Sequence, residues 1–140
     1  MSDTVVDSSV VAKWVLPEPD SAQAHRVVTA AAAGSKLIVV DLVFPEVANA
    51  IWKRRRQGMI TPDEARQAQD ALLRAPLQVE PVAPLLARAF EIASRYDRAV
   101  YDALFVALAE RRGVRGVTAD EPLHRVVHND FPSIVLLRDW

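Results

Sequence analysis

Short apolar runs alternate along the chain with longer segments in which apolar residues recur at helical spacing. The apolar runs predict five strands, at residues 4–6, 37–40, 77–82, 116–118 and 134–137. Helical spacing, with Pro or Gly near several boundaries, predicts seven helices, at residues 8–16, 21–34, 45–58, 62–75, 85–95, 100–112 and 121–128. Strands that alternate with helices imply crossover connections between parallel strands. We therefore predict an α/β fold, a three-layer α/β/α sandwich around a parallel sheet of about five strands.

One helix start carries its own sequence signature. Thr61 precedes Pro62, and Glu64 follows Thr61 by three residues. In this capping-box pattern the Thr side chain accepts a hydrogen bond from the helix backbone, and the Glu side chain accepts one from the Thr backbone. We therefore predict that this helix begins with Thr61 as its N-cap.

Composition narrows the class of protein. The chain has 140 residues and no repeat or Gly/Ser linker, so we expect a single domain at residues 1–140. It has no Cys, which excludes disulfides, Cys-ligated zinc and thiol catalysis. No apolar run approaches the ~18 residues of a membrane span, and the first residues lack the pattern of a signal peptide. We therefore expect a cytoplasmic protein with no membrane partner.

Acidic residues follow the ends of several predicted strands. Asp7 ends the first strand, Asp41 and Glu46 follow the second, and Asp120 follows the fourth. Because a parallel sheet brings these ends to one edge, the carboxylates would repel one another unless a cation lies among them. Hard oxygen ligands without His or Cys favour Mg²⁺ or Mn²⁺. Each acid also has a structural explanation, since Asp7 and Asp120 precede helices as N-caps would, and Glu46 falls in a first helical turn.

Asp102 is a further candidate at the start of a helix. The segment from Val100 to Ala109 is apolar on nearly every side, which predicts burial against the sheet. A carboxylate there needs a partner or a metal, or it interacts with the helix dipole alone. Periodicity does not show whether this helix end faces Asp7.

Four short motifs, taken together, resemble one family. They are VVDSSVVAKW at residues 5–14, PEVANA at 45–50, YDAL at 101–104 and VTAD at 117–120. In this order, and over essentially the whole chain, they resemble the motifs of PIN-domain ribonucleases, specifically the VapC toxins of VapBC toxin–antitoxin pairs.

The resemblance implies a parallel five-stranded sheet and a metal-dependent endoribonuclease. The acids that match the family's Mg²⁺- or Mn²⁺-binding positions are Asp7, Glu46, Asp102 and Asp120. Ser8 and Thr118 match small hydroxyl positions that support these acids. The implied partners are an RNA substrate, a second copy of the chain, and a VapB-like antitoxin whose C-terminal segment binds near the active site.

Roles can be assigned to the acids on this interpretation. We expect Asp7 and Asp102 to be the principal metal ligands. Asp120 is expected to bind a second ion or orient the attacking water, and Glu46 to act as a ligand or as a base. One departure from the family pattern is Ala99, where many members have a Ser or Thr helix cap, and we expect Asp97 to cap the helix instead.

Two surfaces are candidates for contacts outside the acidic site. Lys53, Arg54, Arg55 and Arg56 end one predicted helix, either as favourable charge at a helix C-terminus or as contacts to RNA or antitoxin. The two helices from Phe44 to Ala75 also carry more apolar residues than one sheet face requires, which makes them a candidate dimer surface. These residues are Ile51, Trp52, Met59, Ile60, Leu72 and Leu73.

Two alternatives remain open from the residues alone. A phosphoryl-transfer domain can use a similar sheet, but a haloacid-dehalogenase-type phosphatase needs a second Asp where Ser9 stands, and no Gly-rich Lys loop is present. A PIN-like module could also bind a partner without cleaving RNA. The complete set of four acids argues against this second alternative.

Overall fold

The computed structural model describes residues 3–140 and contains one five-stranded sheet. Its strands are β1 (Thr4–Val6), β2 (Leu37–Val40), β3 (Leu77–Glu80), β4 (Arg115–Thr118) and β5 (Ile134–Leu136). The strand order is β3-β2-β1-β4-β5, and every neighbouring pair is parallel. The central position of β1 places the residue that follows it in the middle of the sheet's carboxyl edge.

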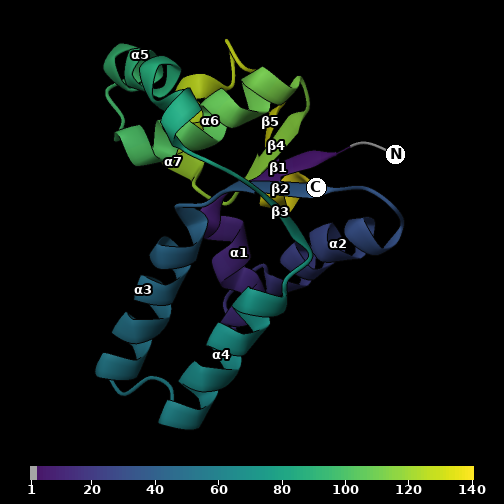
Figure 1. The fold of residues 1–140 in the computed structure, drawn as a ribbon, viewed down its shortest axis with the longest axis vertical. Coiled ribbons are helices and arrows are strands. Elements are labelled where there is room, and N and C mark those ends of the chain that lie inside the picture. Colours follow the sequence, from purple (N-terminus) through teal and green to yellow (C-terminus); the bar gives the residue numbers. More distant parts are fainter. Residues whose placement is uncertain (1–2) are drawn as a thin grey trace.

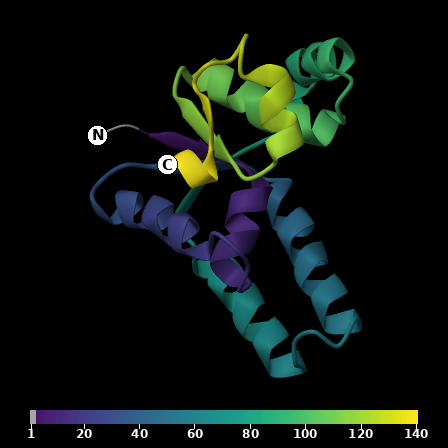
Figure 2. The same cartoon turned by 180° about the vertical axis from the view of Figure 1, so that it is seen from behind.

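Helices cover both faces of this sheet. They are α1 (Ser8–Val15), α2 (Ser21–Ala32), α3 (Val43–Arg56), α4 (Pro62–Arg74), α5 (Leu86–Tyr96), α6 (Val100–Arg112) and α7 (Glu121–Val127), with short 3₁₀ turns η1 (Ala83–Leu85) and η2 (Leu137–Asp139). Helices α1 to α4 lie on one side of the sheet and α5 to α7 on the other, and the α3–α4 hairpin projects away from it (Figures 1 and 2). The predicted α/β/α sandwich is confirmed.

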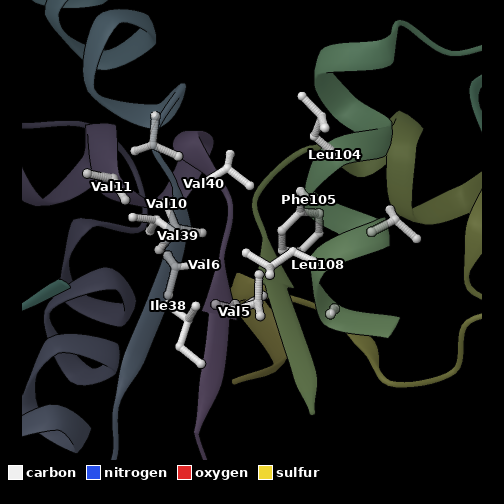
Figure 3. Close-up of a cluster of buried hydrophobic side chains, with 14 of the residues drawn as sticks. Val5, Val6, Val10, Val11, Ile38, Val39, Val40, Leu104, Phe105 and Leu108 are labelled. Carbon is white, nitrogen blue, oxygen red and sulfur yellow. The ribbon is translucent and has the colours of Figure 1, made fainter. Parts of the chain in front are cut away.

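The central strands are buried from both sides. Every residue of β1 and β2 is buried, which explains why these strands read as continuous apolar runs rather than alternating ones. Val10 and Val11 of α1 approach one face, and Phe105 and Leu108 of α6 approach the other (Figure 3). This packing fixes the starts of α1 and α6 against the central strand.

The observed boundaries differ from the predicted ones in small ways that have local causes. Strand β3 stops at Glu80, before Pro81, which has no backbone N–H to continue the strand pairing. Helix α3 begins at Val43, two residues before Pro45, where the sequence predicted its start. The predicted capping box is confirmed: Thr61 Oγ1 accepts from Glu64 N at 3.1 Å, and Glu64 Oε1 accepts from Thr61 N at 2.9 Å. No helix within residues 3–140 has both the length and the apolar character needed to cross a membrane.

The packing of α6 on β4 depends on a glycine. A Cβ atom at Gly116 would lie 2.8 Å from Cζ of Phe105 and 3.0 Å from Cδ1 of Ile134. We expect Gly116→Ala to lower the free energy of unfolding by about 1–3 kcal/mol, because the buried ring of Phe105 would have to shift to admit the new methyl group. Chemical denaturation measures this, and adding Phe105→Leu should restore part of the loss. Equal stability of Gly116→Ala and the wild type would contradict this account of the packing.

Candidate active site

Four acidic side chains line one pocket at the carboxyl edge of the sheet. Asp7 follows β1, Glu46 lies in the first turn of α3, Asp102 in the first turn of α6, and Asp120 follows β4. The pocket has a volume of about 230 Å³, and residues of α1 and α3 complete its wall. The structure thus brings together the four acids that the sequence singled out. Asp41, which also follows a strand, is exposed and does not line this pocket.

Asp7 is held in place by several hydrogen bonds. It is the N-cap of α1, and its Oδ1 accepts from Ser8 N at 2.9 Å. Its Oδ2 accepts from Ser9 Oγ at 2.8 Å and from Thr118 Oγ1 at 2.7 Å. Asp7 is therefore both a helix cap and a site residue. One of its oxygens caps α1, and its carboxylate also lines the pocket.

Two hydroxyl groups link the loops after β1 and β4. Thr118 is fully buried, and its Oγ1 accepts from Asp120 N at 3.0 Å while donating to Asp7. Ser9 Oγ accepts from Ala119 N at 2.9 Å while donating to Asp7. The family motif predicted that Thr118 supports the acids. It did not predict this role for Ser9, although a Ser two residues after a capping Asp often forms such a hydrogen bond.

Ser8 supports two of the acids in different ways. Its backbone N–H, rather than its hydroxyl, binds Asp7. A hydrogen bond from its side chain instead lowers the pKa of Glu46 against the larger effects that raise it. The hydroxyl support of Asp7 comes from Ser9 and Thr118.

Asp102 and Asp120 are joined by an arginine that the sequence analysis did not identify. Arg98 Nη2 donates to Asp102 Oδ2 at 3.0 Å and to Asp120 Oδ2 at 3.3 Å. The other oxygen of Asp120 accepts from Leu123 N at 3.0 Å, so Asp120 is also the N-cap of α7. The spacing of four residues between Arg98 and Asp102 is typical of an ion pair at a helix. This spacing was the feature of the sequence that could have predicted the contact.

The helix cap expected of Asp97 is wrong. Asp97 has a left-handed backbone, with φ of 53°, and ends α5. Ala99 is the N-cap of α6, and no side chain caps this helix start. Asp97 lies two residues before the cap, in the turn that ends the preceding helix. The start of α6 is held instead by the pairing of Asp102 with Arg98.

Burial and mutual repulsion raise the pKa of three of the acids. Burial raises the pKa of Asp7 to about 6, against the hydrogen bonds from Thr118 and Ser9, and the charges of Asp102 and Asp120 add to the rise. Burial and the charges of Asp7 and Asp102 raise the pKa of Glu46 to about 7. Burial also raises the pKa of Asp102, although the Arg98 guanidinium opposes it. Ionising Asp7, Glu46 and Asp102 together is therefore unfavourable when Arg98 is the only cation beside them within residues 3–140.

These shifts predict how the stability of the metal-free protein depends on pH. Because the folded pKa of Asp7 exceeds its value of 3.8 in the unfolded chain, the folded state binds more protons between about pH 4 and pH 6, and stability falls as pH rises through that window. The metal-free wild type should therefore lose stability between pH 5 and pH 7.5, and Asp7→Asn should lose about 1–2 kcal/mol less over this interval, because its amide does not titrate. Thermal melts in chelator at pH 5 and pH 7.5 measure this. An Asp7→Asn variant whose stability falls as steeply as that of the wild type would contradict it.

The predicted basic surface lies apart from the acids. Lys53 to Arg56 end α3, and they do not line the acidic pocket. Arg54 is paired with Glu18, and Arg56 stacks over the ring of Trp52 at 4.7 Å. Lys53 and Arg55 are exposed, so they remain accessible for a contact with a partner.

The apolar residues of the α3–α4 hairpin divide into two groups. Ile51 and Leu72 are buried in the core, and Ile60 packs against it. Trp52, Met59 and Leu73 are exposed by 52%, 63% and 74%. The hairpin thus presents three large apolar side chains that the sheet does not cover.

The oxygen atoms of the four acids suit a hard divalent cation, although they do not surround a single metal position in this structure. The pocket offers carboxylate oxygens and no His or thiol, which is the ligand chemistry of Mg²⁺ or Mn²⁺ rather than zinc. Among residues 3–140, no three acidic or His side chains converge on one metal position. Two of the four acids, Asp102 and Asp120, are paired with Arg98 instead.

Comparison with known proteins places the chain in a family. A family model described as PIN domain matches residues 4–129. The chain is 38% identical over 133 residues to Ribonuclease VapC3 of Pyrobaculum aerophilum, which covers 94% of this chain and 96% of that protein. The chain therefore belongs to the PIN-domain family. Within this family it groups with the VapC ribonucleases, so the predicted family and nuclease class are confirmed. Members of this family generally use a divalent metal.

Solved structures share the fold. PAE2754 from Pyrobaculum aerophilum aligns with a TM-score of 0.69 at 22% identity, over 99% of this chain and 85% of that one. VapC20 of Mycobacterium tuberculosis, a toxin that cleaves the sarcin-ricin loop, aligns with a TM-score of 0.65 at 22% identity, over 88% and 94%. VapBC2 from Rickettsia felis, bound to a DNA fragment from its promoter, aligns with a TM-score of 0.66 at 13% identity, over 97% of both chains.

Proposed function

We propose that this chain is the toxin of a toxin–antitoxin pair and that it cleaves RNA internally with the help of Mg²⁺ or Mn²⁺. The observation that carries the proposal is the gathering of four carboxylates from four separate elements around one pocket, in a chain of the VapC group. A purely structural role would not favour such a set, because neighbouring negative charges repel one another and help to raise the pKa of Asp7, Glu46 and Asp102. On this proposal the chain would act in the cytoplasm.

Asp7 and Asp102 are the residues that would hold the metal, with Asp120 as ligand to a second ion or as the group that orients water. Bound divalent ions supply an activated water and neutralise the charge on the phosphate and the leaving oxygen. Asp7 is suited to a fixed ligand position because Ser9 and Thr118 hold its carboxylate in one orientation. Asp102 stands at the start of a buried helix and cannot drift from the pocket without moving that helix.

Glu46 is suited to proton transfer. With its pKa raised to about 7, it exists in both protonation states near neutral pH. A general base is most effective when its pKa lies near the working pH. It lies in the first turn of α3, on a different element from the other acids that line the pocket. We therefore assign it the removal of a proton from the attacking water, with metal ligation as the alternative.

The partner of the toxin would be an antitoxin segment that carries Arg and large apolar residues. An Arg among the carboxylates would satisfy their charge and compete with the metal. Ala12, Val47 and Ala50 of the same pocket offer an apolar wall for the large side chains. Lys53 and Arg55, at the end of α3, are candidates for contacts to RNA or to the same antitoxin.

The exposed apolar side chains of the hairpin also predict a homodimer. Sedimentation at micromolar concentration should show a dimer, because burying Trp52, Met59 and Leu73 between two copies removes apolar surface from water. The variant Trp52→Ser with Leu73→Ser should shift the equilibrium toward monomer. A monomeric wild type would remove the dimer and leave the nuclease assignment intact.

An assay on RNA tests the proposed function. The purified chain is incubated with total cellular RNA and with a circular RNA, in Mg²⁺ or Mn²⁺, and the fragment ends are mapped. We expect discrete cuts in linear RNA and opening of a circle that contains a cut site, which an exonuclease cannot achieve. The protein encoded beside this chain should suppress the cuts. RNA that remains intact with folded protein in both metals would refute the proposal.

A further inference from the structure

Arg98 lies among the acids of the candidate active site. Its Nη2 contacts Asp102 Oδ2 at 3.0 Å and Asp120 Oδ2 at 3.3 Å, and its side chain is 25% exposed. Its Nε is buried, and among residues 3–140 it has no hydrogen-bond partner. The guanidinium thus uses one nitrogen for both carboxylates and leaves a buried donor unused, which is a costly arrangement unless another ligand completes it.

Arg98 and a divalent cation compete for the charge of the same two carboxylates. Both oxygens of Asp120 are already hydrogen-bonded, Oδ2 to Arg98 and Oδ1 to Leu123 N, and Asp102 also gives its Oδ2 to Arg98. A cation that takes up these carboxylates with all their oxygens would therefore displace Arg98. Once the carboxylates leave, a partly desolvated guanidinium remains at the edge of the pocket and needs a new anion.

We propose that Arg98 exchanges partners during the reaction cycle: it neutralises Asp102 and Asp120 in the metal-free protein, and after metal binding it contacts a phosphate of the RNA. The inference rests on the proposed function and adds a substrate contact to it. A guanidinium has the planar fork that matches two phosphate oxygens, and the unused Nε belongs to that fork. The phosphate replaces the two carboxylates as the anion that Arg98 faces.

A structural role for Arg98 predicts the opposite effect on metal binding. If Arg98 only tied the start of α6 to the start of α7, its removal would loosen Asp102 and Asp120 and weaken metal affinity. If it competes with the metal, its removal strengthens that affinity. The sign of the change therefore separates the two roles.

Mn²⁺ titration of the metal-free protein, followed by electron paramagnetic resonance, measures this sign. We expect Arg98→Met to bind Mn²⁺ about fivefold more tightly than the wild type, as a competing ion pair is lost. Arg95→Met is the matched control, because Arg95 is 67% exposed and pairs with Asp130 outside the pocket. Arg98→Lys should bind Mn²⁺ with intermediate affinity, and it extends the test if the Met variant does not fold. Unchanged or weaker Mn²⁺ binding in both Arg98 variants would overturn the proposal.

RNA binding at saturating Mn²⁺ tests the second half of the exchange. The probe is an RNA that the wild type cleaves, mixed rapidly and read by fluorescence anisotropy before cleavage begins. Arg98→Met should lower the slope of log affinity against log salt by about 0.7, the value for one lost contact on a single strand, while Arg95→Met leaves it unchanged. An unchanged slope in Arg98→Met would overturn the phosphate contact. If the wild type cleaves no RNA, the proposed function fails, and the Mn²⁺ titration still decides whether Arg98 competes with the metal.

Discussion

Asp102→Asn and Asp7→Asn should each lose RNA cleavage by about 100-fold or more, because each removes about 3 kcal/mol or more of metal-mediated transition-state stabilisation. Asn keeps the shape of Asp and removes the charge that a divalent cation requires. Asp102 stands at the first turn of a helix that packs on β1, β2 and β4, so its backbone position survives the change. Single-turnover cleavage at saturating metal measures the loss.

The matched control for these variants is Asp41→Asn. Asp41 also follows a strand of the same sheet, but it is exposed and lies outside the pocket. We expect cleavage by Asp41→Asn to equal that of the wild type, with all three variants melting cooperatively. Wild-type cleavage by Asp7→Asn or Asp102→Asn, after metal removal and refilling, would contradict the assignment of that residue.

Removing divalent metal should abolish cleavage and lower the melting temperature at neutral pH. The acids repel one another without a cation, so a metal at 100 times its Kd should add roughly 2.7 kcal/mol of stability. For a domain of this size that is a shift of several degrees. The shift should shrink at pH 5, because the raised pKa of Asp7, about 6, and of Glu46, about 7, leaves these ligands mostly protonated.

Thermal melts with chelator, Mg²⁺ and Mn²⁺ at both pH values check the second prediction. The Asp102→Asn protein should show a much smaller response to metal than the wild type. A melting temperature that is indifferent to millimolar Mg²⁺ and Mn²⁺ in the wild type at neutral pH would count against a metal site at these acids.

The fold could be predicted from the sequence because the helix caps and the pattern of apolar residues indicate the same elements that the folded chain forms. The all-apolar strands β1 and β2 are buried on both faces, and the capping box at Thr61 forms as its sequence predicts. The convergence of Asp7, Glu46 and Asp120 follows from parallel topology, which brings strand ends to one edge. The position of Asp102 did not follow from periodicity, because a helix start can face any neighbour. The family motifs supplied that placement.

The details of the site depend on side-chain orientation, which spacing does not determine. Ser8 and Ser9 are adjacent hydroxyls, and the helix turn decides that Ser9 reaches Asp7 with its side chain while Ser8 uses its backbone. Arg98 was not identified because its two partners lie on different elements and meet only in the folded chain. The cap assigned to Asp97 failed because the sequence did not reveal the left-handed residue that ends α5.

The chemistry of the RNA ends tests the central claim most directly. If the carboxylates act by holding a divalent cation that activates water, every cut leaves a linear phosphate monoester on one side and a hydroxyl on the other. Cleavage without a metal would instead use the 2′-hydroxyl as nucleophile and leave a 2′,3′-cyclic phosphate. We predict linear ends in Mg²⁺ or Mn²⁺ and no cuts in chelator. Cyclic phosphate ends, produced at the same rate in chelator, would contradict the account.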